Sequence, residues 1–296
     1  MDIDDLQAEF NRWAQRSDLM VTHHLLARAE ALDFLTFLQD ALEMQEALTP
    51  QAATLRTDTQ ALAATLATAN QAIFDWARRA IQTGTLRGTR LRSYLNQFVG
   101  TDNATADGVY TSYDGLDVLI DGIFALGAGP APVRARVAEM VHCEETPARV
   151  ILDLIDHVGW QPADCFYDLG SGLGQVVMLV QLLTGMAARG VEYDPAFVDF
   201  ARRQAAILDL PAVRFVNADA RIADYSDGTI FFLFTPFRGA MLRTVMTRLR
   251  DIAHDHPIRV GTFGPCTPWV AESSWLRPYY GDARHEYQLV LFESLV

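Results

Sequence analysis

The chain has 296 residues, half of them apolar and 21% charged, which is typical of a globular protein and not of a disordered one. Its 24 basic residues are all arginine, which excludes a lysine Schiff base or a lysine general base. Its formal net charge of −13 argues against a broad surface that binds nucleic acid. No apolar run approaches the roughly 20 residues that cross a bilayer, and the acidic start lacks the basic segment of a signal peptide. Three scattered cysteines suit neither a disulfide framework nor a zinc site, so we expect a cytoplasmic protein without a metal.

Residues 1–128 are expected to form an all-α domain that covers the substrate or binds a partner. Apolar residues recur at helical spacing from about residue 18 to Leu42, and Thr49–Pro50 predicts the N-cap and first position of another helix. The apolar residues of that helix alternate steps of four and three: Leu62, Leu66, Ala69, Ile73, Trp76 and Ala80. Such a seam serves either a helical bundle or a coiled coil, so a homodimer through this domain stays open.

Two more helices are expected in this domain, one through Leu91 and Tyr94 to Phe98 and an apolar one from about Leu116 to Leu126. A polar loop, 100–108, separates them.

A local cluster of positive charge interrupts the acidic chain. Five arginines and no acid lie between residues 78 and 92: Arg78, Arg79, Arg87, Arg90 and Arg92. They form either a solvated face or a partner for the acid-rich first 50 residues, or else a patch for an anionic substrate.

Residues 129–159 are interpreted as a linker and a segment that covers the cofactor. The run 127–132 is rich in glycine and proline. Thr146 and Pro147 are then predicted to cap a helix with an apolar face over 150–158.

Residues 160–296 alternate strands with helices, which predicts a parallel sheet with right-handed crossovers. The predicted strands are 165–169, 189–192, 213–217, 230–234 and 258–263, with helices at 195–208 and 238–250 and another that ends before Gly185. Two more runs, 275–279 and 287–292, can form a terminal hairpin. The expected fold is therefore α/β, a Rossmann-like sheet of seven strands with an N-terminal all-α domain.

The strand that ends at Asp168 is followed by a turn that contains Gly170, Gly172 and Gly174. A dinucleotide fingerprint would read G-x-G-x-x-G, but these glycines read G-x-G-x-G. The Asp168 carboxylate would repel a pyrophosphate at the helix N-terminus. It would favour a cationic ligand such as the amino group and sulfonium of S-adenosylmethionine.

Two further acids follow the next two strands. Glu192 ends the second strand, where a carboxylate can accept hydrogen bonds from both ribose hydroxyls. Asp219, just past the third strand, can accept from the adenine amino group, while the Ala220 amide can donate to the ring. Acids at three consecutive strand ends, joined to a glycine turn, predict a site for S-adenosylmethionine.

The region from about 140 to 255 resembles the class I S-adenosylmethionine-dependent methyltransferases. More narrowly, the segment 168–177, DLGSGLGQVV, is similar to the glycine motif of the non-SET histone lysine methyltransferases, the disruptor-of-telomeric-silencing family. Glu145–Thr146, with Thr146 22 residues before Asp168, looks like that family's E-T loop. The resemblance implies that Thr146 and Gln175 contact the methionine end of the cofactor and that the loop of the 140s folds over it. The cofactor is also expected to contact Gly170, Ser171, Gly172, Gly174 and Tyr193.

The chain departs from that family in two respects. The asparagine that the family carries after its fourth strand is Thr235 here, and lysine-rich nucleosome-binding segments have no counterpart. The resemblance therefore extends to the cofactor site and not to a histone substrate. Thr235 either orients the methyl acceptor or caps the helix that follows.

Candidate catalytic residues are those that could remove a proton from the acceptor or orient it: Thr235, His142 and Glu145. Candidate substrate contacts are Tyr110, Tyr113, Phe237, Tyr280 and His285. Tyr110 and Tyr113 belong either to a lid or to an ordinary turn before a helix.

The sequence thus predicts a methyltransferase that uses S-adenosylmethionine and acts on an oxygen or nitrogen of a small or medium organic acceptor. A lysine-type protein methyltransferase is one alternative. An inactive cofactor-binding partner in a complex is another. No nucleic acid or membrane partner is expected.

Overall fold

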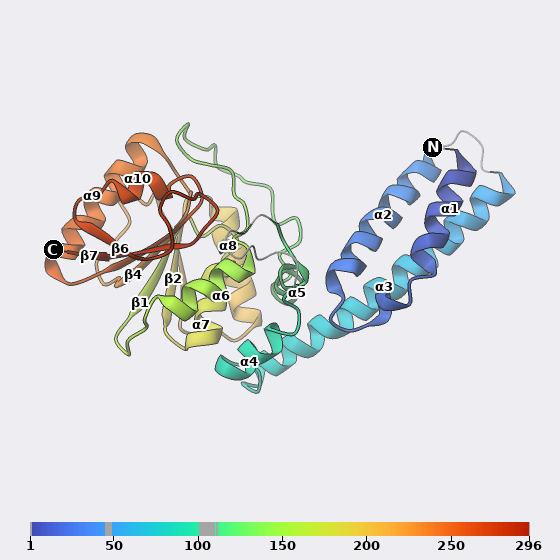
Figure 1. Cartoon of the computed structure of the whole chain (residues 1–296), viewed down its shortest axis with the longest axis horizontal. Coiled ribbons are helices and arrows are strands. Elements are labelled where there is room, and N and C mark those ends of the chain that lie inside the picture. Colours follow the sequence, from blue (N-terminus) through green and yellow to red (C-terminus); the bar gives the residue numbers. More distant parts are fainter. Residues whose placement is uncertain (1, 45–48, 101–109, 111, 296) are drawn as a thin grey trace.

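A computed structural model shows a sheet-bearing body from which a long arm of helices projects (Figure 1). It describes residues 2–44, 49–100, 110 and 112–295. The predicted polar loop lies, apart from Gly100, outside these described residues. None of the described helices is both long and apolar enough to span a membrane.

The arm consists of α1 (Ile3–Ala14), the short 3-10 helix η1 (Ser17–Met20), α2 (Leu25–Glu43) and the first part of α3 (Pro50–Gln82). Asp2 and Asp5 form a capping box at the start of α1. The Thr49 hydroxyl accepts a hydrogen bond from the Ala52 amide at 3.2 Å, so the predicted cap of α3 is confirmed.

The seam of α3 differs from the predicted one. Trp76 is 49% exposed, whereas the polar residues Thr59 and Asn70 are buried. The buried residues of α3 are Ala52, Leu55, Thr59, Leu66, Asn70, Ala77 and Ile81. Asn70 faces inward because its side-chain oxygen accepts a hydrogen bond from the buried guanidinium of Arg28 at 2.5 Å. The predicted seam counted apolar residues only, so it could not include the buried Arg28–Asn70 pair.

The end of α3 packs against the body together with α4 (Gly88–Leu95) and α5 (Gly115–Phe124). α4 is shorter than predicted, since Phe98 lies beyond its end, although the Phe98 side chain is buried. One hydrophobic core joins residues of α3, α4 and α5 to residues of the sheet. The division of the chain at residue 128 therefore stays a prediction.

Three of the five clustered arginines join these helices to one another or to the body. Arg78 donates to the carbonyl oxygen of Ile123 at 2.8 Å, Arg87 donates to carbonyl groups just past α8, and Arg92 pairs with Asp156 at 2.6 Å. These contacts favour a structural role over a patch for an anionic substrate. None of these contacts reaches the acid-rich first 50 residues.

The sheet has seven strands in the order β3-β2-β1-β4-β5-β7-β6. Their bounds are β1 Cys165–Leu169, β2 Ala187–Glu192, β3 Val213–Asn217, β4 Ile230–Phe234, β5 Arg259–Phe263, β6 Leu276–Tyr280 and β7 Val290–Ser294. The first five strands run parallel, and β7 is antiparallel to both β5 and β6. The predicted Rossmann-like sheet with a terminal hairpin is confirmed.

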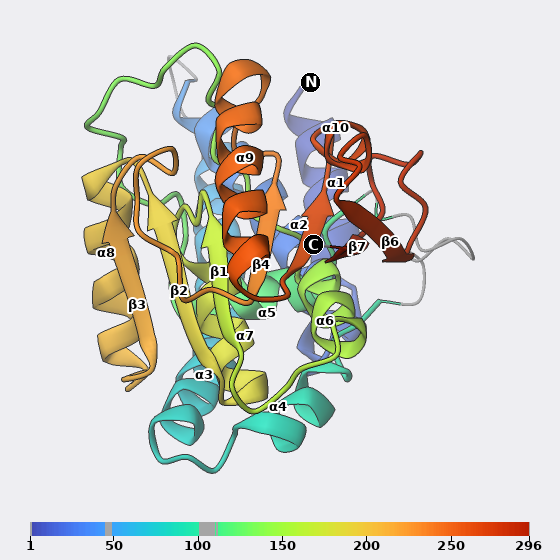
Figure 2. The same ribbon diagram turned by 90° about the vertical axis from the view of Figure 1, so that its left-hand side faces the viewer.

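Helices cover both faces of the sheet (Figure 2). One face carries α6 (Ala148–His157), α7 (Gln175–Thr184) and α8 (Pro195–Ile207), and the other carries α9 (Gly239–Asp255) and α10 (Thr267–Ala271). Successive side chains of a strand point to opposite faces, so Phe166 packs with the first group and Tyr167 with the second. Burial on both faces explains why the central strands are continuous apolar runs.

Two details of the helices differ from expectation. α10 was not predicted. The N-cap residue of α6 is Pro147, and the cap makes no side-chain hydrogen bond. The predicted cap by Thr146 is therefore wrong. The Ala148 amide instead donates to the Asp117 carboxylate of α5 at 2.7 Å, which joins the starts of the two helices.

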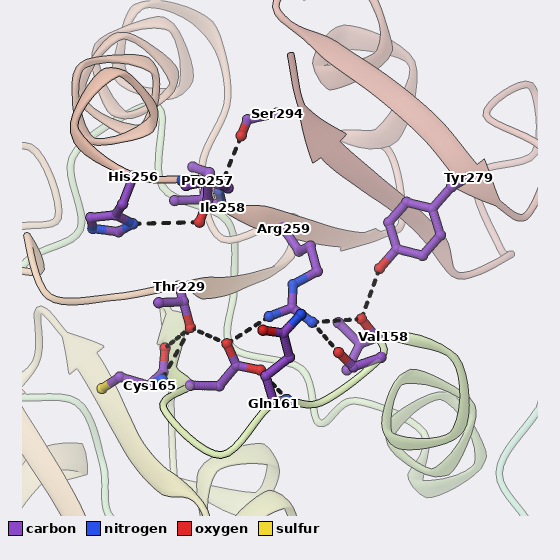
Figure 3. Close-up of polar contacts among 12 residues, drawn as sticks. Val158, Gln161, Cys165, Thr229, His256, Pro257, Ile258, Arg259, Tyr279 and Ser294 are labelled. Carbon is purple, nitrogen blue, oxygen red and sulfur yellow. Dashed lines mark hydrogen bonds and ion pairs between the residues drawn. The ribbon is translucent and has the colours of Figure 1, made fainter. Parts of the chain in front are cut away.

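A polar network closes the sheet at the amino ends of β1, β4 and β5 (Figure 3). Arg259 donates to the Asp164 carboxylate at 2.6 Å and to the Val158 carbonyl oxygen at 3.1 Å. The Thr229 hydroxyl donates to the same carboxylate at 2.8 Å, and Tyr279 donates to Val158 at 3.2 Å. This network lies at the opposite end of the strands from the pocket described next.

Candidate active site

A pocket, called here the cofactor pocket, opens at the carboxyl ends of β1, β2 and β4. The chain order of the strands reverses between β1 and β4, and open α/β sheets bind ligands at such a point. The residues predicted for the cofactor that line it are Thr146, Asp168, Gly170, Ser171, Gly172, Gln175, Glu192, Tyr193 and Ala220. The sequence motif and the pocket therefore coincide.

The glycine turn takes its shape from left-handed backbone angles. Gly172 has a φ of +49°, and a Cβ added there would lie 2.6 Å from the Cys143 sulfur. Gly174 does not line the pocket: with a φ of +87° it forms the N-cap of α7, and a Cβ there would meet the Phe215 ring at 2.5 Å. Gly172 thus keeps the turn close to the opposite wall, and Gly174 packs α7 and α8 onto the sheet.

Two carboxylates form the acidic side of the cofactor pocket: Asp168, which is buried, and Glu192, which is half-buried. Asp168 is 4% exposed, and burial together with the charge of Glu192 raises the pKa of Asp168 to about 8. Its carboxylate makes no hydrogen bond to any described residue. The Glu192 carboxylate accepts from the Gly172 amide at 2.9 Å and the Asp194 amide at 2.8 Å, and burial raises its pKa as well. A cationic ligand group would relieve the cost of burying Asp168.

Two buried polar atoms in the same wall lack a partner among the described residues. They are Ser171 Oγ and Gln175 Oε1. Buried polar atoms are normally satisfied, so each of these calls for an explanation. A bound ligand that reaches the turn would supply the missing hydrogen bonds.

Residues 132–146, called here the covering segment, extend along one side of the cofactor pocket. At its start, the amides of Val133 and Arg134 donate to one oxygen of Asp194 at 2.9 and 2.8 Å. The other oxygen of Asp194 accepts from Ala196 at the start of α8. A single carboxylate thus caps a helix and fixes the covering segment.

The middle of the covering segment is fixed at the start of α9. The Glu139 carboxylate accepts from the Ala240 and Met241 amides at 2.6 and 3.0 Å, where the helix N-terminus favours negative charge. Met140 and Phe237 form an antiparallel bridge next to this contact. Glu139 and Asp194 were not predicted; the Asp194–Pro195 pair does have the composition of a helix start.

The covering segment places two of the three candidate catalytic residues at the cofactor pocket. His142 and Glu145 both line it. Glu145 is half-buried, and burial, followed by the charges of Asp121 and Asp117, raises its pKa to about 7. The Tyr113 hydroxyl donates to the Glu145 carbonyl oxygen at 2.8 Å, which ties the entry to α5 to this segment.

Thr235 does not line the cofactor pocket, unlike its neighbours Phe234 and Pro236. Its hydroxyl donates to the Phe263 carbonyl oxygen at 3.2 Å and accepts from the Cys266 amide at 3.1 Å. Cys266 is the N-cap residue of α10, so Thr235 satisfies the start of that helix and not of α9. This geometry does not support the role in orienting the acceptor.

We therefore expect Thr235→Ala to lower the free energy of unfolding by about 1 kcal/mol and to leave turnover and cofactor affinity unchanged. The loss comes from the two hydrogen bonds of the hydroxyl. Melting temperature, calorimetric affinity and turnover on the one variant measure it. A tenfold fall in turnover at unchanged stability would instead show that Thr235 acts on the acceptor.

Asp219 also lies outside the lining of the cofactor pocket. Its carboxylate accepts from the Arg221 guanidinium at 2.6 Å and from the Arg221 amide at 2.9 Å, and the first contact lowers the pKa of Asp219. The predicted hydrogen bond to the adenine amino group would have to compete with this ion pair. Ala220 does line the pocket.

Of the five candidate substrate contacts, Phe237 alone lines the cofactor pocket. The Tyr280 hydroxyl donates to Asp153 of α6 at 2.7 Å, and the Tyr280 ring stacks on His157. His285 is exposed in the turn before β7, 4.0 Å from Asp282. For Tyr280 and His285 the predicted substrate contact is not supported.

Tyr110 does not line the cofactor pocket. Its amide donates to the Tyr287 carbonyl oxygen at 2.9 Å, and its ring contacts Phe263 edge-on. Tyr113 contacts the covering segment through its hydrogen bond to the Glu145 carbonyl oxygen. Both tyrosines connect separate segments of the chain, which agrees better with a supporting element than with direct contact to an acceptor.

A family model supports the sequence motif. The model described as "Histone methylation protein DOT1" matches residues 136–217, which include the covering segment from Arg136, the glycine turn and Glu192. The chain is similar to this family over that segment. The predicted class of enzyme, an S-adenosylmethionine-dependent methyltransferase, is thereby confirmed. A search of curated proteins finds no similar sequence.

Solved methyltransferase structures are similar to roughly half of the chain. An RNA methyltransferase from Salinibacter ruber in complex with S-adenosylhomocysteine is 25% identical, with 51% of this chain and 92% of that chain covered and a TM-score of 0.37. A TehB-like enzyme from Corynebacterium glutamicum is 18% identical, with 49% and 86% covered and a TM-score of 0.37. A tRNA (uracil-54, C5) methyltransferase from Pyrococcus abyssi is 18% identical, with 57% and 45% covered and a TM-score of 0.40.

Proposed function

We propose that this protein binds S-adenosylmethionine in the cofactor pocket and transfers its methyl group to a nitrogen or oxygen of an organic acceptor. The observation that supports this most strongly is the buried Asp168 carboxylate beside two unpartnered polar atoms, Ser171 Oγ and Gln175 Oε1. A ligand that carries both a positive charge and hydrogen-bonding groups would satisfy all three.

The methionine end of the cofactor would lie toward Asp168 and Gln175, with its ammonium group near the Asp168 carboxylate. The ribose hydroxyls would then reach Glu192, which already orients its oxygens through the Gly172 and Asp194 amides. Adenine would lie beside Ala220. Ser171 and Thr146 would supply further polar contacts from the turn and the covering segment.

Methyl transfer from a sulfonium is a displacement in which the acceptor lone pair forms the new bond to carbon. The carbon–sulfur bond breaks, and its electron pair stays on sulfur to give S-adenosylhomocysteine. A hydroxyl or ammonium acceptor must also lose a proton. Glu145, with a pKa of about 7, suits this step because a base works best when its pKa is close to the working pH. Positioning of the two reactants supplies the rest of the acceleration.

The proposed base can be tested with Glu145→Gln. We expect turnover to fall by about two to four powers of ten, while the affinity for S-adenosylhomocysteine changes less than about threefold. Turnover of the unmodified protein should rise as the pH passes through about 7, because the raised pKa keeps Glu145 protonated below that pH.

The control is Glu30→Gln, which removes one exposed charge from α2. It should leave both turnover and the pH profile unchanged. If Glu145→Gln retained full turnover with the same rise near pH 7, Glu145 would not be the base.

A protein acceptor is the second candidate, and the family match at 136–217 favours it. The chain has no lysine and a net charge of −13, so a basic surface for nucleosomes is not available. Methyl-labelled cofactor offered with histones, a mixed soluble protein extract and small amines separates the two candidates. A protein that binds cofactor and forms no S-adenosylhomocysteine with any acceptor would be the inactive partner of a complex.

We propose that the helical arm selects the acceptor or binds a second chain. It carries its own small core, and exposed apolar side chains such as Phe37 and Met44 lie on or just after α2. The oligomeric state in solution, measured with and without residues 2–44, tests this proposal.

A further inference from the structure

A second cavity of about 370 Å³ lies between α9, α10 and the turn before β6. It shares no lining residue with the cofactor pocket. Its size is within the range of sites that bind small molecules, about 300–1,000 Å³. The first turn of α9 separates the two, since Met241 lines the cofactor pocket and Leu242 lines the second cavity.

One stripe of α9 forms a wall of the second cavity. Its members follow the spacing of one helical face: Gly239, Leu242, Arg243, Met246, Thr247 and Arg250. Leu242 and Met246 are buried and form the apolar floor. The two arginines stand at the solvent side of the same stripe, where both are exposed.

Two indole rings supply the opposite wall. Trp269 of α10 is 62% exposed although it lines the second cavity, and Trp275 is half-buried beside it. Large flat side chains left this open are costly in water, and their faces attract flat apolar groups and cations. A ligand with a flat body would cover them.

The charged side chains at the rim of the second cavity favour a ligand of negative charge. In the described part of the chain, the guanidinium groups of Arg243 and Arg250 have neither an ion pair nor a hydrogen bond. Glu272 is the one acid among the lining residues. Arginine binds carboxylate, sulfonate and phosphate groups through two parallel hydrogen bonds.

We propose that the second cavity is a binding site for a small anionic ligand with a flat apolar body. The flat part would lie between Trp269 and the floor of Leu242 and Met246. The anionic group would pair with Arg243 and Arg250. This site is independent of the cofactor and of the methyl acceptor, so it can be tested whatever the acceptor is.

The test uses anilinonaphthalene sulfonate as the probe and its neutral analogue N-phenylnaphthylamine as the control ligand. Saturating S-adenosylhomocysteine is present throughout, so that the probe cannot enter the cofactor pocket. We expect saturable binding of one sulfonate per chain with quenching of tryptophan fluorescence, and at least about tenfold weaker binding of the neutral analogue.

Variants locate the site. Arg243→Gln with Arg250→Gln should weaken sulfonate binding by about tenfold or more. Lys at both positions should lose less, because an ammonium group keeps the charge and gives up only the paired hydrogen bonds. Trp269→Ala should remove most of the quenching. The matched control, Arg79→Gln with Arg90→Gln, removes two exposed arginines of α3 and α4 and should change nothing.

Three results would overturn the proposal. The first is the absence of saturable binding at one site per chain. The second is equal affinity for the neutral analogue. The third is an equal loss of affinity in the control pair. Each variant is first shown to melt as the unmodified protein does, and the lysine pair provides a folded comparison if the glutamine pair does not.

Discussion

Asp168→Asn should weaken S-adenosylhomocysteine binding by about 10- to 100-fold, and it should raise the melting temperature of the ligand-free protein at pH 8. The first effect is the loss of a charge-assisted hydrogen bond to the ligand ammonium, about 1.5–3 kcal/mol. The second effect has the opposite sign because a buried carboxylate without partners is costly in the empty pocket.

The pH dependence separates the two effects. Folding raises the pKa of Asp168 from about 3.8 to about 8, so the folded protein keeps a proton that the unfolded chain gives up. The contribution of this group to stability is therefore neutral below about pH 4, falls as the pH rises toward 8, and stays at its lowest value above that. An asparagine does not titrate, so its advantage should be on the order of several degrees at pH 8 and should vanish near pH 4.

Thermal melting at a series of pH values and calorimetry with S-adenosylhomocysteine measure both effects. Asp58→Asn serves as the control because Asp58 is an exposed acid on α3. Unchanged ligand affinity in Asp168→Asn would mean that Asp168 does not face the ligand ammonium. A melting difference that does not depend on pH would mean that its pKa is not raised.

Arg259→Met is expected to lower the free energy of unfolding by about 3–5 kcal/mol, with little change in cofactor affinity. The Asp164 carboxylate is almost fully buried and has Arg259 as its cationic partner at 2.6 Å. Methionine would leave that charge uncompensated at the amino ends of the strands (Figure 3). Because the cofactor pocket is at the carboxyl ends, folded protein should still bind ligand.

The control removes an exposed pair of the same kind. Arg277 and Glu293 form an ion pair at 2.6 Å on the surface of the hairpin, and Arg277→Met should cost less than about 1 kcal/mol. Adding Asp164→Asn to Arg259→Met should recover part of the loss. Equal costs for Arg259→Met and Arg277→Met in denaturant melts would contradict the account of the buried pair.

The sheet could be predicted from the sequence because its signals are local. β1, β3 and β4 begin and end at the predicted residues, since each apolar run is bounded by turn residues. The hairpin is less exact: the predicted strand from residue 287 begins at Val290, because the aromatic Tyr287 is half exposed in the turn. An aromatic side chain favours a strand in sequence patterns, and tertiary packing decides whether one forms.

The part of the site formed by the glycine motif and the acids at the strand ends could be predicted from the sequence. Gly170 and Gly172 of the glycine turn line the cofactor pocket, as do Asp168 and Glu192. The roles of Thr235 and Asp219 stay predictions: both lie outside the lining of the cofactor pocket, and their hydrogen bonds to Cys266 and Arg221 follow from no spacing rule.

Other parts depend on distant contacts. The fixing of the covering segment at the starts of α8 and α9 joins residues that are 60 to 102 positions apart. The buried Arg28–Asn70 pair likewise shifted the seam of α3.

The most direct test of the central claim is a calorimetric titration of the protein with S-adenosylhomocysteine, with NAD as the comparison. The cofactor pocket predicts one site per chain with micromolar affinity, about −8 kcal/mol, and no binding of NAD, because Asp168 stands where a pyrophosphate would lie. Binding of NAD without binding of S-adenosylhomocysteine would contradict the account.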